Sequence, residues 1–300
     1  MSTHAWNYIF KWTFSAQWFF KHRTEVIYIQ EQELSFVRHE DKSSIAIGFA
    51  KDEFCYHKGI DGLRYYLVIP YLRKYMTTFG EIRLSIDDMV AECGYSTNSR
   101  SSKVHTTFRQ ILQELSDSGY ILTDVDLLDI KRNSYFKIKL PENKNIFFSQ
   151  KQYVVFTIRE FETIVNSGSR CNTSLLAGVY LSIKKNIFMN NDLTNSLQIA
   201  FPSKYNICKE LGMSSMTSVE SAINELANLG LLFIRSNLYI ADYKNADQFI
   251  AARNIYALDK KHLSGRDCIK ELEHRCYESN HVFTRDELPE GAVISYLTKI

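Results

Sequence analysis

The segment from Ser99 to Gln113 combines cations, hydroxyls and amides, and it contains no carboxylate before Glu114. If it is a helix with Phe108 turned inward, steps of about 100° per residue place a polar set on the opposite face. Arg and Lys neutralise phosphates, and Arg and Gln pair in a bidentate manner with guanine and adenine edges. The pattern predicts binding of a polyanion, with an outward face of Ser102, Lys103, Thr106, Gln110 and Gln113, and Arg109 on its flank.

A second cationic segment, Lys131 to Ser134, lies between two expected strands at 120–125 and 135–140. Its composition is typical of a turn. Acidic residues separate it from the first segment, so the cations are segregated along the chain. We therefore expect a helix in a DNA groove and a loop on the backbone. The predicted DNA-binding residues are Ser99, Arg100, Ser102, Lys103, Thr106, Arg109, Gln110, Gln113, Lys131 and Arg132.

Two stretches of the chain show the same order of expected elements, at 84–121 and at 203–232. Each has a short helix, a glycine turn (Gly94 or Gly212), a longer helix, a glycine stop (Gly119 or Gly230) and an apolar strand. Ser85 is expected to cap the first short helix. This order is typical of a winged helix-turn-helix, and its repetition favours a tandem arrangement.

The longer helix of the second copy presents a different face. With Ile223 inward, the outward residues are Thr217, Ser218, Ser221, Glu225 and Asn228, which include no cation. We expect this helix to contact protein or to bind DNA more weakly than the first. Leu231–Ile234 and Leu238–Ile240 are expected to pair tightly around Ser236 and Asn237, giving a short wing.

The fold class predicted from these patterns is mostly α (α+β), with small antiparallel sheets. We expect a strand-containing N-terminal extension (1–60), a DNA-reading winged helix (61–145), a second winged helix (146–243) and a helical C-terminal extension (244–300). Residues 61–78 have helical spacing that Pro70 is expected to kink or interrupt. Alternating aromatic residues at 6–14 suit a buried strand better than a stacking surface for single-stranded DNA.

Composition narrows the class of protein. The 300 residues carry a net charge of +2, so a nucleic-acid surface would require local segregation of charge. Six scattered cysteines without a CxxC pair are typical of a reducing compartment, and no apolar run approaches the roughly 18 residues of a membrane span. The start of the chain lacks the pattern of a signal peptide. We expect a cytoplasmic protein that does not enter the membrane.

Motifs for common catalytic chemistry are absent from the sequence. It has no GxxxxGK[ST], GxGxxG, HExxH or GxSxG and no His-x-His pair. Cys268, His274, Cys276 and His281 have spacings that match no common zinc module. We expect neither an enzyme nor a bound cofactor or metal.

The stretch from Tyr71 to Leu140 resembles the winged-helix DNA-binding domain of replication initiator and replisome-organiser proteins. These proteins are carried by plasmids, phages and mobile elements of low-GC Gram-positive bacteria. The matching residues are Tyr71–Tyr75, Ser85–Met89, Gly94–Ser96 and Phe108–Ile121. The resemblance implies binding of double-stranded DNA at an origin, with recruitment of host replication proteins such as a helicase or its loader.

Two other functions fit the same residues. A winged-helix transcription regulator would use the same helix, and a protein–protein adaptor could keep the fold without binding DNA. The carboxylate-free face at 99–113 argues against the adaptor. A homodimer is a further expectation, because symmetric dimers are common among such DNA readers and either terminal region could supply the contact.

Overall fold

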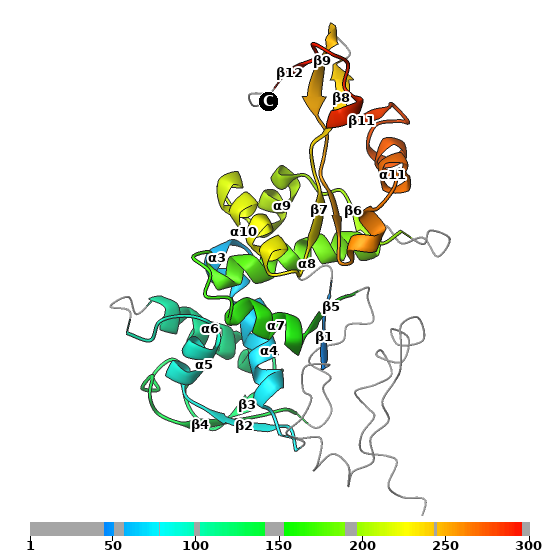
Figure 1. Ribbon diagram of the computed structural model, residues 1–300. Coiled ribbons are helices and arrows are strands. Elements are labelled where there is room, and N and C mark those ends of the chain that lie inside the picture. Colours follow the sequence, from blue (N-terminus) through cyan, green and yellow to red (C-terminus); the bar gives the residue numbers. More distant parts are fainter. Residues whose placement is uncertain are drawn as a thin grey trace, which may run out of the picture. The chain divides into compact units, whose positions relative to one another are not determined.

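The computed structural model describes residues 45–50, 57–77, 79–98, 103–141, 153–189, 197–242 and 245–295 (Figure 1). The chain divides into two compact units, Met1–Gly168 and Ser169–Ile300. Both combine helices with small sheets that are mainly antiparallel, as the sequence predicts. The unit boundary falls inside the segment 146–243 that the sequence predicts to be a second winged helix. Among the described residues, no helix has the length and apolar character needed to cross a bilayer.

The first unit is built around a central buried helix. Helix α3 (Gly59–Leu63) leads into α4 (Tyr65–Tyr75), in which every residue from Tyr66 to Leu72 is buried. The interruption between the two helices lies at Arg64, whereas α4 continues through Pro70, so a fresh helix start at the proline is not observed. A helix that is apolar on all sides belongs in a core, and α5, α6 and α7 pack against α4.

The remaining elements of this unit follow the predicted order. They are β2 (Glu81–Leu84), α5 (Ile86–Glu92), α6 (Lys103–Asp117), β3 (Leu122–Thr123) and β4 (Phe136–Lys139). The Ser85 side chain accepts a hydrogen bond from the backbone N–H of Asp88, which confirms the predicted cap. The three antiparallel strands have the order β2-β4-β3, so the strand before the helix pair lies beside the last strand.

A separate two-stranded sheet precedes α7. Strand β1 (Ala46–Ala50) pairs antiparallel with β5 (Tyr153–Thr157), and α7 (Ile158–Val165) follows β5 directly. Strand β1 lies within the strand-containing extension expected at 1–60, and its Ile47 and Phe49 are buried. The aromatic stretch at 6–14 lies outside the described residues.

The second unit repeats the element order of the first. It contains α8 (Thr173–Met189), β6 (Ile199–Ala200), α9 (Lys204–Leu211), α10 (Met216–Asn228), β7 (Phe233–Arg235) and β10 (Ile255–Ala257). The strand order is β6-β10-β7, so the first strand again lies beside the last. Ser203 caps α9 as Ser85 caps α5. The two copies recognised in the sequence thus share strand order as well as element order.

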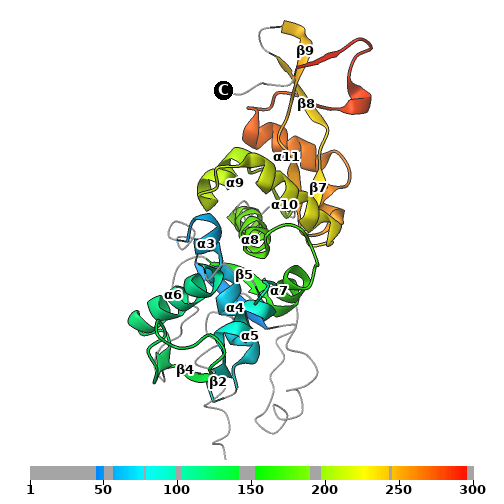
Figure 2. The same cartoon turned by 90° about the vertical axis from the view of Figure 1, so that its left-hand side faces the viewer.

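The predicted tight pair around Ser236 and Asn237 is wrong. Strand β7 pairs with β10, while β8 (Leu238–Asp242) pairs with β9 (Asn245–Ala251). Strands β7 and β8 are therefore consecutive parts of one side of a long ribbon, which Figures 1 and 2 both show. Asn237 joins them in a left-handed conformation with φ 58°. The connection between β7 and β10 in the second copy is therefore long, where the sequence predicted a short one.

The expected helical C-terminal extension contains a single α-helix among its described residues, and strands make up much of the rest. After β9 and β10, the chain forms a 3₁₀ turn (Lys260–Leu263), α11 (Asp267–Cys276), β11 (Val282–Thr284), a second 3₁₀ turn (Arg285–Glu287) and β12 (Val293–Ser295). Strands β11 and β12 flank the ribbon in the order β11-β8-β9-β12. All of Ile255, Tyr256 and Ala257 are buried because β10 is the middle strand of its sheet, and such an apolar run imitates a helix.

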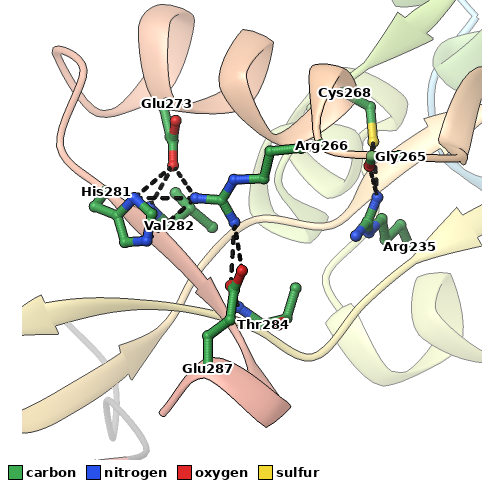
Figure 3. Close-up of polar contacts among 9 residues, drawn as sticks. All are labelled: Arg235, Gly265, Arg266, Cys268, Glu273, His281, Val282, Thr284 and Glu287. Atoms are coloured by element: carbon green, nitrogen blue, oxygen red, sulfur yellow. Dashed lines mark hydrogen bonds and ion pairs between the residues drawn. The ribbon is translucent and has the colours of Figure 1, made fainter. Parts of the chain in front are cut away.

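One arginine fastens α11 to the strand and turn that follow it (Figure 3). Arg266 contacts Glu273 at 2.7 Å and Glu287 at 3.1 Å, and Glu273 also accepts the backbone N–H of Val282 at 2.8 Å. His281 joins this group, whereas Cys268 faces Arg235. Within the described ranges, no three His, Cys, Asp or Glu side chains are grouped as a metal site.

Phe108 is fully buried on α6, whereas Gln110 on the same helix is exposed. Replacing Phe108 by Ala removes a large core side chain and should destabilise the protein by about 3–5 kcal/mol. Gln110→Ala is the matched control and should change stability by less than about 0.5 kcal/mol. Urea denaturation followed by circular dichroism measures both. Similar midpoints for the two variants would contradict the packing described for α6.

His57 stacks on Tyr65 with ring centroids 3.7 Å apart, and burial lowers the pKa of His57 from 6.5 to about 4. The unfolded chain therefore binds this proton more readily than the folded chain. The contribution of neutral His57 is fully present above pH 6.5 and is lost as the pH falls toward 4. We expect His57→Phe, which keeps a stacking ring, to lose less thermal stability than the parent between pH 7 and pH 5. Equal losses would contradict this.

Candidate nucleic-acid interface

The exposed side of α6 carries most of the predicted face. Lys103, Thr106 and Gln110 are exposed, and the Lys103 side chain is 71% accessible. Gln113 is half-buried and donates from Nε2 to Asp117 Oδ1 at 2.7 Å. The opposite side of the helix holds Phe108, Ile111, Leu112 and Leu115 in the core. Ser99, Arg100 and Ser102 lie outside the described residues.

Arg109 has a structural contact. Its Nη2 donates to the backbone carbonyl of Ile130 at 2.6 Å, and its Nε is buried without a hydrogen-bond partner. Ile130 belongs to the loop 126–134 between β3 and β4. Arg109 therefore connects α6 to this loop, a role that the sequence did not reveal.

The loop 126–134 folds against the helices. Leu127 is fully buried, and the carbonyl of Arg132 accepts the backbone N–H of Asp87 at 2.9 Å. An Asx turn at Asp126 and a turn from Lys131 to Ser134 order the loop internally. The predicted basic tip is consequently held beside α5 and α6, where Lys131 and Arg132 are both exposed.

Several cations that appear unopposed in the sequence have acidic partners in space. Lys103 Nζ lies 2.9 Å from Asp61 Oδ2 on α3, and this hydrogen bond lowers the pKa of Asp61. Lys137 and Lys139 both pair with Glu81 on β2, which lowers the pKa of Glu81. By contrast, Lys131 makes no ion pair with a residue that the structure describes.

Sequence reasoning missed a buried polar pair beneath this surface. His105 on α6 is 3% exposed, and its Nε2 lies 3.0 Å from Asp87 Oδ1 on α5. Both atoms are buried, and neither has a hydrogen-bond partner with suitable geometry. The two side chains are therefore in close polar contact without forming a hydrogen bond. Asp87 Oδ2 lies 3.6 Å from Arg132 Nε. An acidic residue in the first turn of a helix was visible in the sequence, but its partners were not.

Arg83 is a further exposed cation that the sequence did not single out. It lies on β2 opposite Lys137 on β4, and its guanidinium lies 5.7 Å from the ring centre of Tyr135. Tyr135 is 58% exposed and follows the loop 126–134. The strand side of the unit thus adds a cation and an aromatic ring near the end of the loop.

The corresponding surface of the second unit has no cation on its long helix. The exposed residues of α10 are Met216, Thr217, Glu220, Ser221, Asn224 and Asn228. Of the predicted face, Ser218 donates to Ser215 Oγ at 3.1 Å, and Glu225 is half-buried. Glu220 pairs with Lys204 on α9. This helix offers hydrogen bonds but no positive charge.

Comparisons with protein-family models, curated proteins and solved structures find no match to this chain.

Removal of the Arg109 side chain should loosen the loop 126–134. A hydrogen bond from a charged group contributes about 1.5–3 kcal/mol, so local opening should increase at least about tenfold in Arg109→Ala. Trypsin cleavage after Lys131 or Arg132, followed by mass spectrometry, reports this opening. Gln110→Ala on the same helix should leave the cleavage rate unchanged. An unchanged rate in Arg109→Ala would show that the contact does not hold the loop.

Proposed function

We propose that the first unit is a winged helix that binds double-stranded DNA through α6 and the loop 126–134. The order of helices and strands and the β2-β4-β3 arrangement support this assignment. In such a unit the second helix of the pair enters the major groove while the loop between the last strands contacts the backbone. The winged-helix assignment, though not DNA contact, extends to the second unit, whose β6-β10-β7 sheet has the same strand order.

The observation that carries the proposal is the exposed stripe of Lys103, Thr106 and Gln110, with Lys131 and Arg132 held nearby. Gln110 provides an amide for base edges, and the cations provide contacts to phosphates. Lys103 keeps most of its side chain accessible although it contacts Asp61, so a phosphate can reach it. An exposed ion pair of this kind contributes little stability and is readily exchanged.

The biological role that we propose is initiation of replication at an origin on a plasmid, phage or mobile element. This role rests on the resemblance of residues 71–140, and host replication proteins such as a helicase or its loader would be the partners. The second unit suits protein contact better than DNA contact, because α10 has no cation to offer phosphate. A cytoplasmic location and the absence of catalysis belong to the same proposal.

Two alternatives use the same fold. A transcription regulator would bind DNA through the same helix, and occupancy of genomic sites distinguishes it: origin repeats support initiation, whereas promoter operators support regulation. An adaptor without nucleic-acid binding would show no shift of any duplex in a gel. The exposed cations of the first unit favour DNA binding over the adaptor.

The salt dependence of binding tests the proposal. We expect the double variant Lys103→Ala/Lys131→Ala to lose two phosphate contacts, so that the slope of log K against log[NaCl] becomes less steep by about 1.8. Fluorescence anisotropy with a labelled duplex, titrated at several NaCl concentrations, measures this slope.

Lys139→Ala is the matched control, because Lys139 is an exposed lysine of the same unit that lies on β4 and not on α6 or in the loop 126–134. It should leave the slope nearly unchanged. No duplex binding by the parent protein, or equal slopes in the parent and the double variant, would reject the proposed interface.

A further inference from the structure

Asp87 contacts both the loop and the helix of the proposed DNA interface. It lies in the first turn of α5, where its backbone N–H donates to the Arg132 carbonyl at 2.9 Å. Its Oδ2 lies 3.6 Å from Arg132 Nε, and its Oδ1 lies 3.0 Å from Nε2 of His105 on α6. A single residue of α5 therefore connects the loop 126–134 with α6.

The Arg132 side chain is held at a second point. Its Nη1 donates to the carbonyl of Thr97 at 3.4 Å, in the turn that leads toward α6. The side chain is nevertheless 53% exposed. It is thus oriented by a carboxylate and a carbonyl while about half of the side chain remains accessible to solvent. A pre-oriented guanidinium loses less conformational entropy when it binds phosphate than a free one does.

We propose that Asp87 is a positioning residue for duplex DNA binding, which holds Arg132 beside the start of α6 for contact with a backbone phosphate. The ring of His105 lies beside the other carboxylate oxygen, with Nε2 at 3.0 Å. The inference rests on the proposed function, and it assigns a favourable role to an acidic residue within a phosphate-binding surface. A carboxylate that acted only through its charge would repel phosphate and weaken binding.

The neighbouring residue Asp88 separates these two effects. It is half-buried in the same helical turn and carries the same charge, but its carboxylate bonds to Tyr135 and raises the pKa of that phenol. Asp88→Asn therefore removes a negative charge at nearly the same place without touching Arg132. Asp87→Asn preserves side-chain shape and the backbone N–H, so the bond to the Arg132 carbonyl remains available.

The experiment measures the affinity of the full chain for a fluorescein-labelled random-sequence duplex at fixed NaCl. We expect Asp87→Asn to weaken binding about threefold, less than the loss of a whole phosphate contact. In an Arg132→Ala background, Asp87→Asn should no longer weaken binding, because residues that act through one another are not additive. Asp88→Asn should leave binding unchanged or slightly tighter in both backgrounds.

Arg132→Lys provides a second test that does not alter α5. It preserves the charge but loses the planar fork, so it should weaken binding about as much as Asp87→Asn. Circular dichroism melting verifies that each variant is folded. Tighter binding by Asp87→Asn, equal weakening in both backgrounds, or parental affinity of Arg132→Lys would overturn the positioning role.

Failure of the inference is distinguishable from failure of the proposed function. If the parent chain binds duplex and Lys103→Ala/Lys131→Ala lowers the salt slope, while Asp87→Asn has no effect, only the role of Asp87 is rejected. If the parent chain does not bind duplex, the proposed function and the positioning role are rejected together.

Discussion

The surface of the first unit depends on how the backbone carbonyls of the loop 126–134 are satisfied. Two of them, on Ile130 and Arg132, accept hydrogen bonds from Arg109 on α6 and from the N–H of Asp87 on α5. The first N–H groups of a helix have no partner within the helix, so Asp87 has a donor available for the loop. Together with buried Leu127, these bonds turn a polar segment into a fixed part of the helix pair.

Because the loop 126–134 is fixed to the helices, the cations on the surface are grouped differently from the cations along the sequence. Along the sequence, the cations at 131–139 form one block without an acidic residue, but in space they divide into two sets. All four are exposed, but Lys137 and Lys139 pair with Glu81, whereas Lys131 and Arg132 lie in the loop held beside α5 and α6. A phosphate would meet the second set without displacing a carboxylate from Lys131. The folded structure thus separates cations that are neighbours in the sequence into two groups with different partners.

Local signals predicted much of the fold. The Ser85 cap, the apolar face of α6 and the repeated order of helices and glycines all depend on neighbours within a few residues, and all are observed. The errors concern pairing over longer distances. Strand β7 pairs with β10, some twenty residues later, and buried β10 has no alternation to mark it as a strand. Similarly, the contacts of Arg109 and Asp87 with the loop depend on tertiary packing, which helical spacing cannot predict.

The two units show how one arrangement of elements can carry different surfaces. Both place the first strand beside the last and cap the short helix with serine. The long helix α6 presents Lys103, whereas α10 presents Glu220 paired with Lys204. The loop between the last strands is short and fixed to the helices in the first unit, but in the second it is extended into a ribbon flanked by β11 and β12. Core positions decide the fold, and exposed positions decide which partners are contacted. The two copies therefore share a fold but differ in their exposed residues. Positive charge on the long helix and a loop fastened beside it occur together in the first unit, whereas α10 of the second unit carries no cation, which is why we propose DNA contact for the first unit alone.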